Sequence, residues 1–262
     1  MTDADVVILD APEPLAHHVA ERLVAEIALA QTERGTASVV LTGGGMGGRT
    51  LAAVGDLDTS AVDWSRVDVW WGDERFVPAH DEERNERQAR EAALDRLGLD
   101  PQRVHAVPAA GDAATAEEAA ERYAAELAAV SEAAGNRPTD GTAVPAFDVL
   151  LLGVGPDAHV ASLFPELDAV QERSATVLAV HDAPKPPPHR VTLTLPAINA
   201  ARQVWLVVSG ADKAGAVALA ANGAAAAQVP AAGVNGTERT VWFLDGAAAA
   251  QLPDQDEDTG TQ

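Results

Sequence analysis

Short, mostly apolar runs recur along the chain and are separated by longer stretches with helical spacing. The runs predict strands over residues 6–9, 38–41, 67–71, 147–152, 191–195, 204–208 and 240–244. Between the first two runs, apolar residues recur every four positions and mark one face of a helix: Leu15, Val19, Leu23 and Ile27. Strands that alternate with helices are typical of a parallel sheet. We expect an α/β fold with a mostly parallel, Rossmann-like sheet, helices on both faces and a smaller second lobe.

Two further helices are predicted from possible capping boxes. Asn85 followed by Gln88 predicts a helix that continues to about Leu97. Thr115 followed by Glu118 predicts a second helix. The inner face of this second helix would carry Ala116, Ala120, Tyr123, Leu127 and Val130.

Residues 133–146 are rich in glycine, proline and asparagine and predict a loop. We expect one α/β domain over 1–252, with a possible boundary between lobes near 133–146. The polar, acidic segment 253–262 is expected to be disordered. Residues 1–10 lack the basic region of a signal peptide. The longest uncharged stretch, 214–237, is broken by glycine and proline and is a poor membrane span. The sequence favours a cytoplasmic monomer without membrane contact.

The net charge of −22 argues against a nucleic-acid partner, because phosphate contacts need clustered Lys and Arg. The chain has no cysteine, which excludes disulfides, thiol catalysis and thiolate metal sites. Its histidines lack the spacing of metal ligands, so no metal is expected. Lys185 and Lys213 are the only lysines among eighteen basic residues. Lysine offers a compact point charge for an anion, although a compositional bias toward arginine explains this count equally well.

Four predicted strands end in glycine or polar residues. These ends carry the segment from Gly43 onward, Asp73 with Arg75, Asp157 with His159, and Lys213. Ligands of parallel α/β sheets bind beyond the carboxyl ends of the strands, and right-handed crossovers bring those ends to one edge. The sequence therefore predicts a single site at this edge.

The glycine-rich segments 43–48 and 153–158 both fit the dinucleotide pattern G-x-G-x-x-G/A. That fingerprint also needs an acidic residue at the end of the next strand, whereas Asp63 lies before the strand. A glycine loop that leads into a helix can bind any phosphate through its backbone N–H groups, so a sugar phosphate suits it as well. The chain has no G-x-S-x-G nucleophile motif. Water activated by His159 is then the simplest nucleophile.

Five blocks of the chain together resemble the 6-phosphogluconolactonases: residues 41–45, 71–78 with Asn85, 151–165, 183–192 and 210–213. The resemblance implies an α/β enzyme that hydrolyses 6-phosphogluconolactone, a phosphorylated sugar lactone, to 6-phosphogluconate in the pentose phosphate pathway. It implies no cofactor and no metal. His159 would be the general base that activates water, with either Asp73 or Asp157 orienting it.

The same resemblance implies roles for the other site residues. Asp73 and Arg75 would orient the substrate and stabilise developing charge. Substrate binding would use the phosphate-binding glycine loop together with three polar or charged residues, in full Gly43, Gly44, Gly45, Asn85, Arg190 and Lys213.

Two departures from the family pattern lie in these blocks. Where the family often has a hydroxyl residue after the first glycines, this chain has Gly45-Met46-Gly47. Where the family has D-G-H, it has Asp157-Ala158-His159. If residue 158 needs a positive φ, alanine costs about 1 kcal/mol there.

Two other functions stay open at this point. The related glucosamine-6-phosphate deaminases share the fold and a D-G-H block but continue with F-N-E-P, whereas this chain has Ser162-Leu163-Phe164-Pro165-Glu166. A non-catalytic sugar-phosphate sensor of this fold would carry a DNA-binding segment before the sheet. This chain enters its first strand by Val6, and its acidity opposes DNA.

Overall fold

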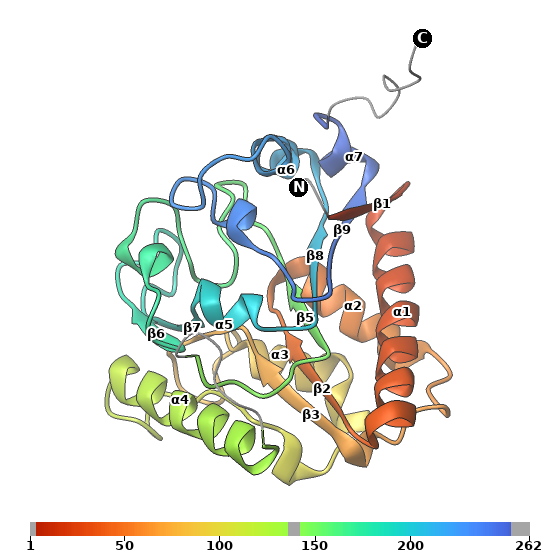
Figure 1. The fold of residues 1–262 in the computed structure, drawn as a ribbon, viewed down its shortest axis with the longest axis vertical. Coiled ribbons are helices and arrows are strands. Elements are labelled where there is room, and N and C mark those ends of the chain that lie inside the picture. The colour runs from red at the N-terminus through yellow and green to blue at the C-terminus, as the bar shows by residue number, and fades with distance from the viewer. Residues whose placement is uncertain (1–3, 136–141, 253–262) are drawn as a thin grey trace.

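A six-stranded parallel sheet forms the centre of the computed structural model, which describes residues 4–135 and 142–252 (Figure 1). Its strand order is β1-β9-β8-β5-β2-β3, and every neighbouring pair is parallel. The strands are β1 (Asp5–Leu9), β2 (Ala37–Leu41), β3 (Val67–Trp71), β5 (Val149–Leu152), β8 (Gln203–Val208) and β9 (Arg239–Asp245). They coincide with six predicted runs, and the mostly parallel α/β fold is confirmed.

Helices cover both faces of this sheet (Figure 1). The helices α1 (Pro12–Arg34) and α2 (Gly44–Asp56) pack together on one face, with α3 (Asn85–Ala92) beside α2. On the other face lie α4 (Ala116–Ala133) and α5 (Leu195–Asn199), while α6 (Ala214–Ala221) and α7 (Gly246–Ala249) lie near the β1 and β9 edge. Short 3₁₀ turns occupy Trp64–Arg66, Leu94–Arg96, Pro101–Arg103, Asp168–Gln171, Ala211–Lys213 and Pro230–Gly233. The apolar face predicted for the first helix is buried.

A second, three-stranded sheet lies beside α4. Its antiparallel strands are β4 (Asp73–Arg75), β7 (Arg190–Leu193) and β6 (Val177–Val180), in the order β4-β7-β6. The strand predicted over 191–195 is β7, but it ends at Leu193 because the Thr194 hydroxyl accepts the Ala197 N–H and starts α5. The sequence patterns did not predict β4 or β6. The first consists of three charged residues and is too short to show a period, and the second has only four residues.

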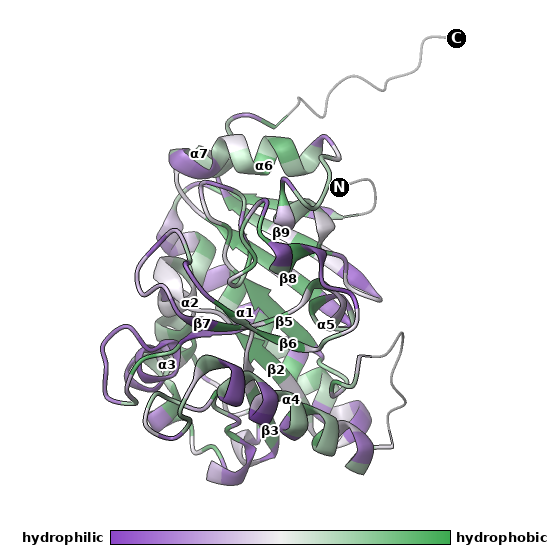
Figure 2. Ribbon diagram, turned by 90° about the vertical axis from the view of Figure 1, so that its left-hand side faces the viewer, coloured by the Kyte–Doolittle hydropathy of each residue, from purple (hydrophilic) through white to green (hydrophobic). Residues whose placement is uncertain are grey.

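The core is built around four tryptophans at most 2% exposed: Trp70, Trp71, Trp205 and Trp242. Buried apolar residues from both sides of segment 133–146 belong to one continuous cluster, and the central strands are correspondingly apolar in Figure 2. The Tyr123 hydroxyl ties α4 to β3, because it donates to the Trp71 carbonyl (3.0 Å) and accepts from the Trp71 N–H (2.9 Å). The predicted acidic tail, 253–262, lies outside the described residues, as do residues 136–141 of the predicted loop.

The capping box predicted at Asn85 is wrong. Arg84 is the N-cap of α3 and makes no side-chain cap, while the Asn85 amide donates instead to the Asp73 carbonyl. The N–H groups of the first turn are satisfied by Glu74, a residue of β4. The helix ends at Ala92, because the next residues form a 3₁₀ turn, and does not reach Leu97. At Thr115 the predicted N-cap is confirmed, since its hydroxyl accepts the Glu118 N–H at 3.2 Å, but the Glu118 carboxylate accepts the Ala114 N–H and not that of Thr115.

Candidate active site

The carboxyl ends of β2, β5 and β8, together with β4 and β7, surround one cleft of about 440 Å³. Nine of the ten predicted site residues line this cleft: Gly43, Gly44, Gly45, Asp73, Arg75, Asn85, His159, Arg190 and Lys213. The tenth, Asp157, contacts His159 from the side. Residues that are more than one hundred positions apart in the sequence are thus brought to one edge of the parallel sheet, as its topology predicts.

His159 and Asp157 form a hydrogen-bonded pair on the turn that follows β5. The imidazole Nδ1 lies 2.5 Å from Asp157 Oδ1, so Asp157, and not Asp73, is the carboxylate in contact with His159. Gly155 makes room for the pair, because a Cβ there would lie 2.0 Å from His159 Nδ1. The contact at Nδ1 leaves the Nε2 atom available to the cleft. A histidine held in this way can accept a proton from a water molecule.

Burial and charge set the protonation of this pair. Burial lowers the pKa of His159, and nearby Lys185 lowers it further; the contact with Asp157 acts in the opposite direction without cancelling the shift. The Lys185 ammonium lies 3.8 Å from Asp157 Oδ1. Burial opposes ionisation of Asp157, but its hydrogen bond to His159 keeps the pKa of the carboxyl below the ordinary value. The pair is therefore a neutral imidazole beside a carboxylate at neutral pH.

The Asp73 carboxylate contacts Ser162 and Arg190, and the residue is only 6% exposed. The Ser162 hydroxyl donates to its Oδ2 atom at 2.7 Å, and Arg190 Nη1 lies 3.9 Å from the same atom. The other nitrogens of Arg190 are occupied, since Nε and Nη2 donate to the carbonyls of Pro187 and Lys185. Arg190 thus fixes the loop that carries Lys185 and keeps only Nη1 for the cleft.

Arg75 and Asn85 close the side of the cleft next to Asp73. Arg75 Nη1 donates to the Glu83 carbonyl at 2.5 Å, and Nε is buried without a hydrogen-bond partner among the described residues. Asn85 Nδ2 donates to the Asp73 carbonyl at 2.8 Å. The Asn85 amide packs so tightly on Gly43 that a Cβ at residue 43 would lie 1.9 Å from its Oδ1 atom. Glycine is therefore required at residue 43 for this contact.

The glycine loop leads directly into α2, which begins at Gly44 and has no side-chain cap. The N–H groups of its first turn are free of intrahelical partners and can bind an anion. Lys213, just beyond β8, lines the same cleft and contacts Asp212. Arg49 also lines it from the second turn of α2, while making an ion pair with Glu13. A cationic pocket thus exists in a strongly acidic protein.

Three residues of the site were missed or left unassigned by sequence reasoning: Arg49, Ser162 and Lys185. Arg49 directly follows the glycine loop, and Lys185 is one of only two lysines, so both carried a usable signal. Ser162 is fully buried, and only the three-dimensional contact with Asp73 reveals it. Ala158 has a φ of 66°, which is the left-handed conformation that glycine adopts freely. The conditional expectation of strain at this residue is therefore met.

Neither a metal cluster nor a membrane-spanning helix is found in the part of the chain that the structure describes. No group of three or more His, Cys, Asp or Glu side chains there is arranged to hold a metal ion. No helix over residues 4–135 and 142–252 is long and apolar enough to cross a bilayer.

Comparison with known proteins gives consistent results. The family model described as glucosamine-6-phosphate isomerases/6-phosphogluconolactonase matches residues 10–242. A protein of Streptomyces coelicolor named 6-phosphogluconolactonase is 56% identical over 244 residues, which cover 92% of each chain. The crystal structure of 6-phosphogluconolactonase from Thermotoga maritima is 26% identical, with a TM-score of 0.78 over 92% of this chain and 99% of that one. A monomeric glucosamine-6-phosphate deaminase shares the fold at 20% identity, with a TM-score of 0.75 over 94% of this chain and 99% of that one.

Proposed function

Because the chain belongs to the glucosamine-6-phosphate isomerase/6-phosphogluconolactonase family, we propose that it hydrolyses 6-phospho-D-glucono-1,5-lactone to 6-phosphogluconate. The observation that carries this proposal is the His159–Asp157 pair at 2.5 Å in a cleft lined by cationic side chains. The name of the relative with 56% identity supports the same reaction. We place the enzyme in the cytoplasm and in the pentose phosphate pathway, and we expect it to act as a monomer without a cofactor.

The nucleophile in this proposal is water. Nε2 of His159 accepts a proton as the water oxygen attacks the lactone carbonyl carbon, and the carbonyl oxygen becomes an oxyanion. The tetrahedral intermediate then collapses, and the bond between this carbon and the ring oxygen breaks. The ring oxygen leaves as a hydroxyl after it takes the proton from His159. Asp157 holds the Nδ1–H of the ring throughout and stabilises the transient imidazolium.

Charge developing on the carbonyl oxygen needs donors that are fixed before the reaction. Arg75 is suited to this, because it lines the cleft and its guanidinium is held in place through Nη1 by the Glu83 carbonyl. Asp73 is a hydrogen-bond acceptor fixed by Ser162 and Asn85, and we assign it to the sugar hydroxyls. These assignments match the roles that the family resemblance implies.

We assign the phosphate to the glycine loop and Lys213. The uncapped first turn of α2 offers backbone N–H groups, and Lys213 offers an ammonium. Arg190 contributes through Nη1 alone, since its other nitrogens hold the loop of Lys185. A protein with a net charge of −22 repels a dianion at long range, so we expect binding to depend on these close contacts.

The reaction class is tested with purified protein treated with a chelator. We expect it to hydrolyse freshly generated 6-phosphogluconolactone faster than the spontaneous rate and to release no ammonia from glucosamine 6-phosphate. Ammonia release without lactone hydrolysis would identify a deaminase, which the shared fold permits. Tight binding of 6-phosphogluconate without either activity would identify a sensor.

A further inference from the structure

We propose that Glu74 is a positioning residue for this reaction, which holds Arg75 and Asn85 in place beside Asp73. The inference rests on the proposed function for its kinetic readout. Glu74 lies between two residues that line the cleft, yet it does not line the cleft itself. Its side chain is 1% exposed, which makes it one of the most buried charged residues among those described.

The alternation of β4 separates Glu74 from its neighbours. Successive side chains of a strand point to opposite faces, so Asp73 and Arg75 share the face toward the cleft and Glu74 takes the other. Behind the cleft, the Glu74 carboxyl meets the start of α3. Its Oε1 atom accepts the Asn85 N–H at 2.7 Å, and its Oε2 atom accepts the Glu86 N–H at 2.9 Å. A carboxylate at a helix N-terminus satisfies N–H groups that lack intrahelical partners.

A second set of hydrogen bonds connects Glu74 and Asn85 to the backbone of the cleft residues Asp73 and Arg75. The Glu74 Oε1 atom also accepts the Arg75 N–H at 2.8 Å, so one oxygen holds the backbone of both cleft residues. Asn85 Nδ2 in turn donates to the Asp73 carbonyl at 2.8 Å. These contacts close a ring of hydrogen bonds through Asp73, Glu74 and Asn85.

The buried Arg84 guanidinium completes the surroundings of Glu74. Its Nη2 atom lies 3.7 Å from Glu74 Oε2 and donates to the Val107 carbonyl at 2.8 Å. Burial raises the pKa of Glu74, whereas Arg84 and the three backbone N–H groups lower it, so Glu74 joins β4 to the start of α3 chiefly by its hydrogen bonds. Loss of this junction would let Asn85 and Arg75 shift relative to Asp73, and a displacement of about 1 Å in a catalytic group can cost about 100-fold in rate.

The experiment compares Glu74→Ala and Glu74→Gln with the wild-type enzyme. For each we measure kcat and KM for the lactone, the Kd for 6-phosphogluconate and the thermal unfolding midpoint. We expect Glu74→Ala to lower kcat/KM per folded molecule about 100-fold. Glu74→Gln keeps one carbonyl oxygen for Arg75 and Asn85 but cannot accept the Glu86 N–H, so we expect about a 10-fold loss. If Glu74→Ala does not fold, the positioning role is tested with Glu74→Gln alone, because glutamine conserves the volume of the side chain.

Thr115→Ala is the matched control. Thr115 caps α4, outside the cleft, so its loss removes a comparable cap without touching the site. It should lower the unfolding midpoint and leave kcat/KM unchanged. A second comparison places Glu74→Gln in an Asn85→Ala background, where its effect should shrink if Glu74 acts through Asn85.

The outcomes separate the two proposals. A wild-type enzyme with lactonase activity and Glu74 variants that keep normal kcat/KM would overturn the positioning role. A wild-type protein without lactonase activity would overturn the proposed function. The Kd for 6-phosphogluconate then tests the positioning role, which requires weaker binding in Glu74→Gln and unchanged binding in Thr115→Ala.

Discussion

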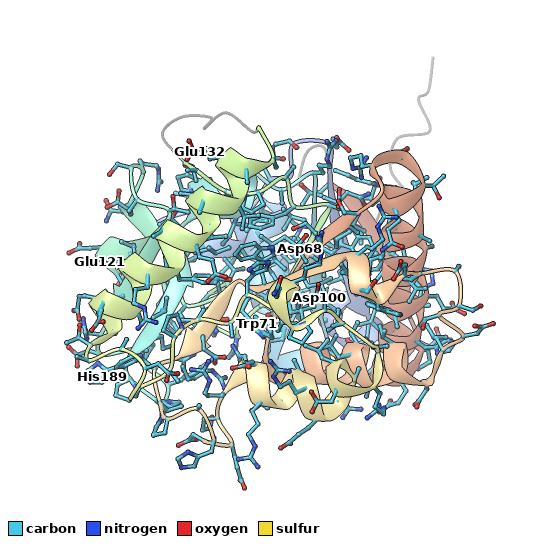
Figure 3. The ribbon with its side chains drawn as sticks, turned by 90° about the horizontal axis from the view of Figure 1, so that it is seen from below. Asp68, Trp71, Asp100, Glu121, Glu132 and His189 are labelled. Carbon is cyan, nitrogen blue, oxygen red and sulfur yellow. The ribbon has the colours of Figure 1, made fainter. Side chains whose placement is uncertain are left out.

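Two histidines lie at opposite ends of the parallel sheet, one partly buried (His159) and one buried (His105), and the contacts of their ring nitrogens differ. His159, at the carboxyl ends, contacts one carboxylate through Nδ1. His105 lies near the amino end of β3, where its Nδ1 and Nε2 atoms contact Glu126 (2.7 Å) and Asp68 (3.0 Å). Figure 3 views the molecule from below and labels Asp68. Among the described residues, one ring nitrogen of His159 has no hydrogen-bond partner, whereas both ring nitrogens of His105 have one.

The number of carboxylates in contact with each imidazole sets the direction of its pKa shift. At both histidines, burial by itself acts to lower the pKa. At His105 the two carboxylates outweigh burial and raise the pKa, whereas at His159 one carboxylate does not. Since both nitrogens of His105 face carboxylates, the protonated ring can donate to both and join α4 to β3. It also stacks on Trp70 with ring centroids 3.7 Å apart. His105 is therefore a structural clamp, while His159 can exchange a proton.

The largest effect should follow loss of the free nitrogen at His159. We expect His159→Ala to lower kcat for the lactone by about 10²–10⁴-fold, the usual loss for a positioned general base. His105→Gln is the control and should keep kcat near that of the wild-type enzyme, because His105 does not line the cleft. Steady-state assays of both variants below their unfolding temperatures check this contrast. Near-normal turnover in His159→Ala would overturn the assignment of the base.

The next effect concerns Lys213, a cation that lines the same cleft as His159. We expect Lys213→Ala to raise KM by about 10–100-fold, because a charged hydrogen bond is worth roughly 1.5–3 kcal/mol. The turnover number should fall less, since the phosphate is bound alike in the ground and transition states. Kinetics with phosphorylated and unphosphorylated lactone check this, and the unphosphorylated substrate should show little change. If KM is unchanged in Lys213→Ala, the phosphate is bound by the glycine loop and Arg190 and not by Lys213.

The sheet and the convergence of its strand ends were predictable, because buried parallel strands are continuous apolar runs and their connections have a fixed hand. His159 could be selected from seven histidines because it follows such a strand and a glycine turn. At Ala158 the sequence predicted a cost of alanine only on the condition of a positive φ, and the φ of 66° meets that condition.

Other features depend on contacts that no local pattern encodes. The cap of α3 comes from Glu74, eleven residues before Asn85, so the local signal at Asn85 and Gln88 was misleading. The pairing of His105 with Glu126 and Asp68 joins three separate elements and was invisible in the sequence. The sequence also left open which carboxylate orients His159, and only the 2.5 Å contact singles out Asp157.

A smaller effect should appear in the stability of the His105 clamp. Its raised pKa contributes stability that is fully present below the unfolded value of about 6.5 and is lost as the pH rises through the folded value. We expect His105→Gln to lower the free energy of unfolding by about 2 kcal/mol at pH 6. The difference from the wild-type protein should narrow as the pH increases. Urea unfolding followed by tryptophan fluorescence between pH 6 and 9 measures this, and a constant difference would show that His105 is neutral.

The smallest effect should come from Lys185, the cation next to the catalytic pair. Lys185 lowers the pKa of His159, so its removal should raise that pKa toward the ordinary value. Activity needs neutral His159, and kcat/KM therefore rises with pH through this pKa. We expect Lys185→Met to move the acidic limb of the kcat/KM profile to higher pH, while Lys213→Ala leaves the position of the limb unchanged. A limb that moves to lower pH, or that moves equally in both variants, would contradict a specific interaction between Lys185 and the His159–Asp157 pair. The position of the limb separates the electrostatic role of Lys185 from a role in substrate binding. A loss of substrate binding would lower the height of the kcat/KM profile and leave its midpoint in place.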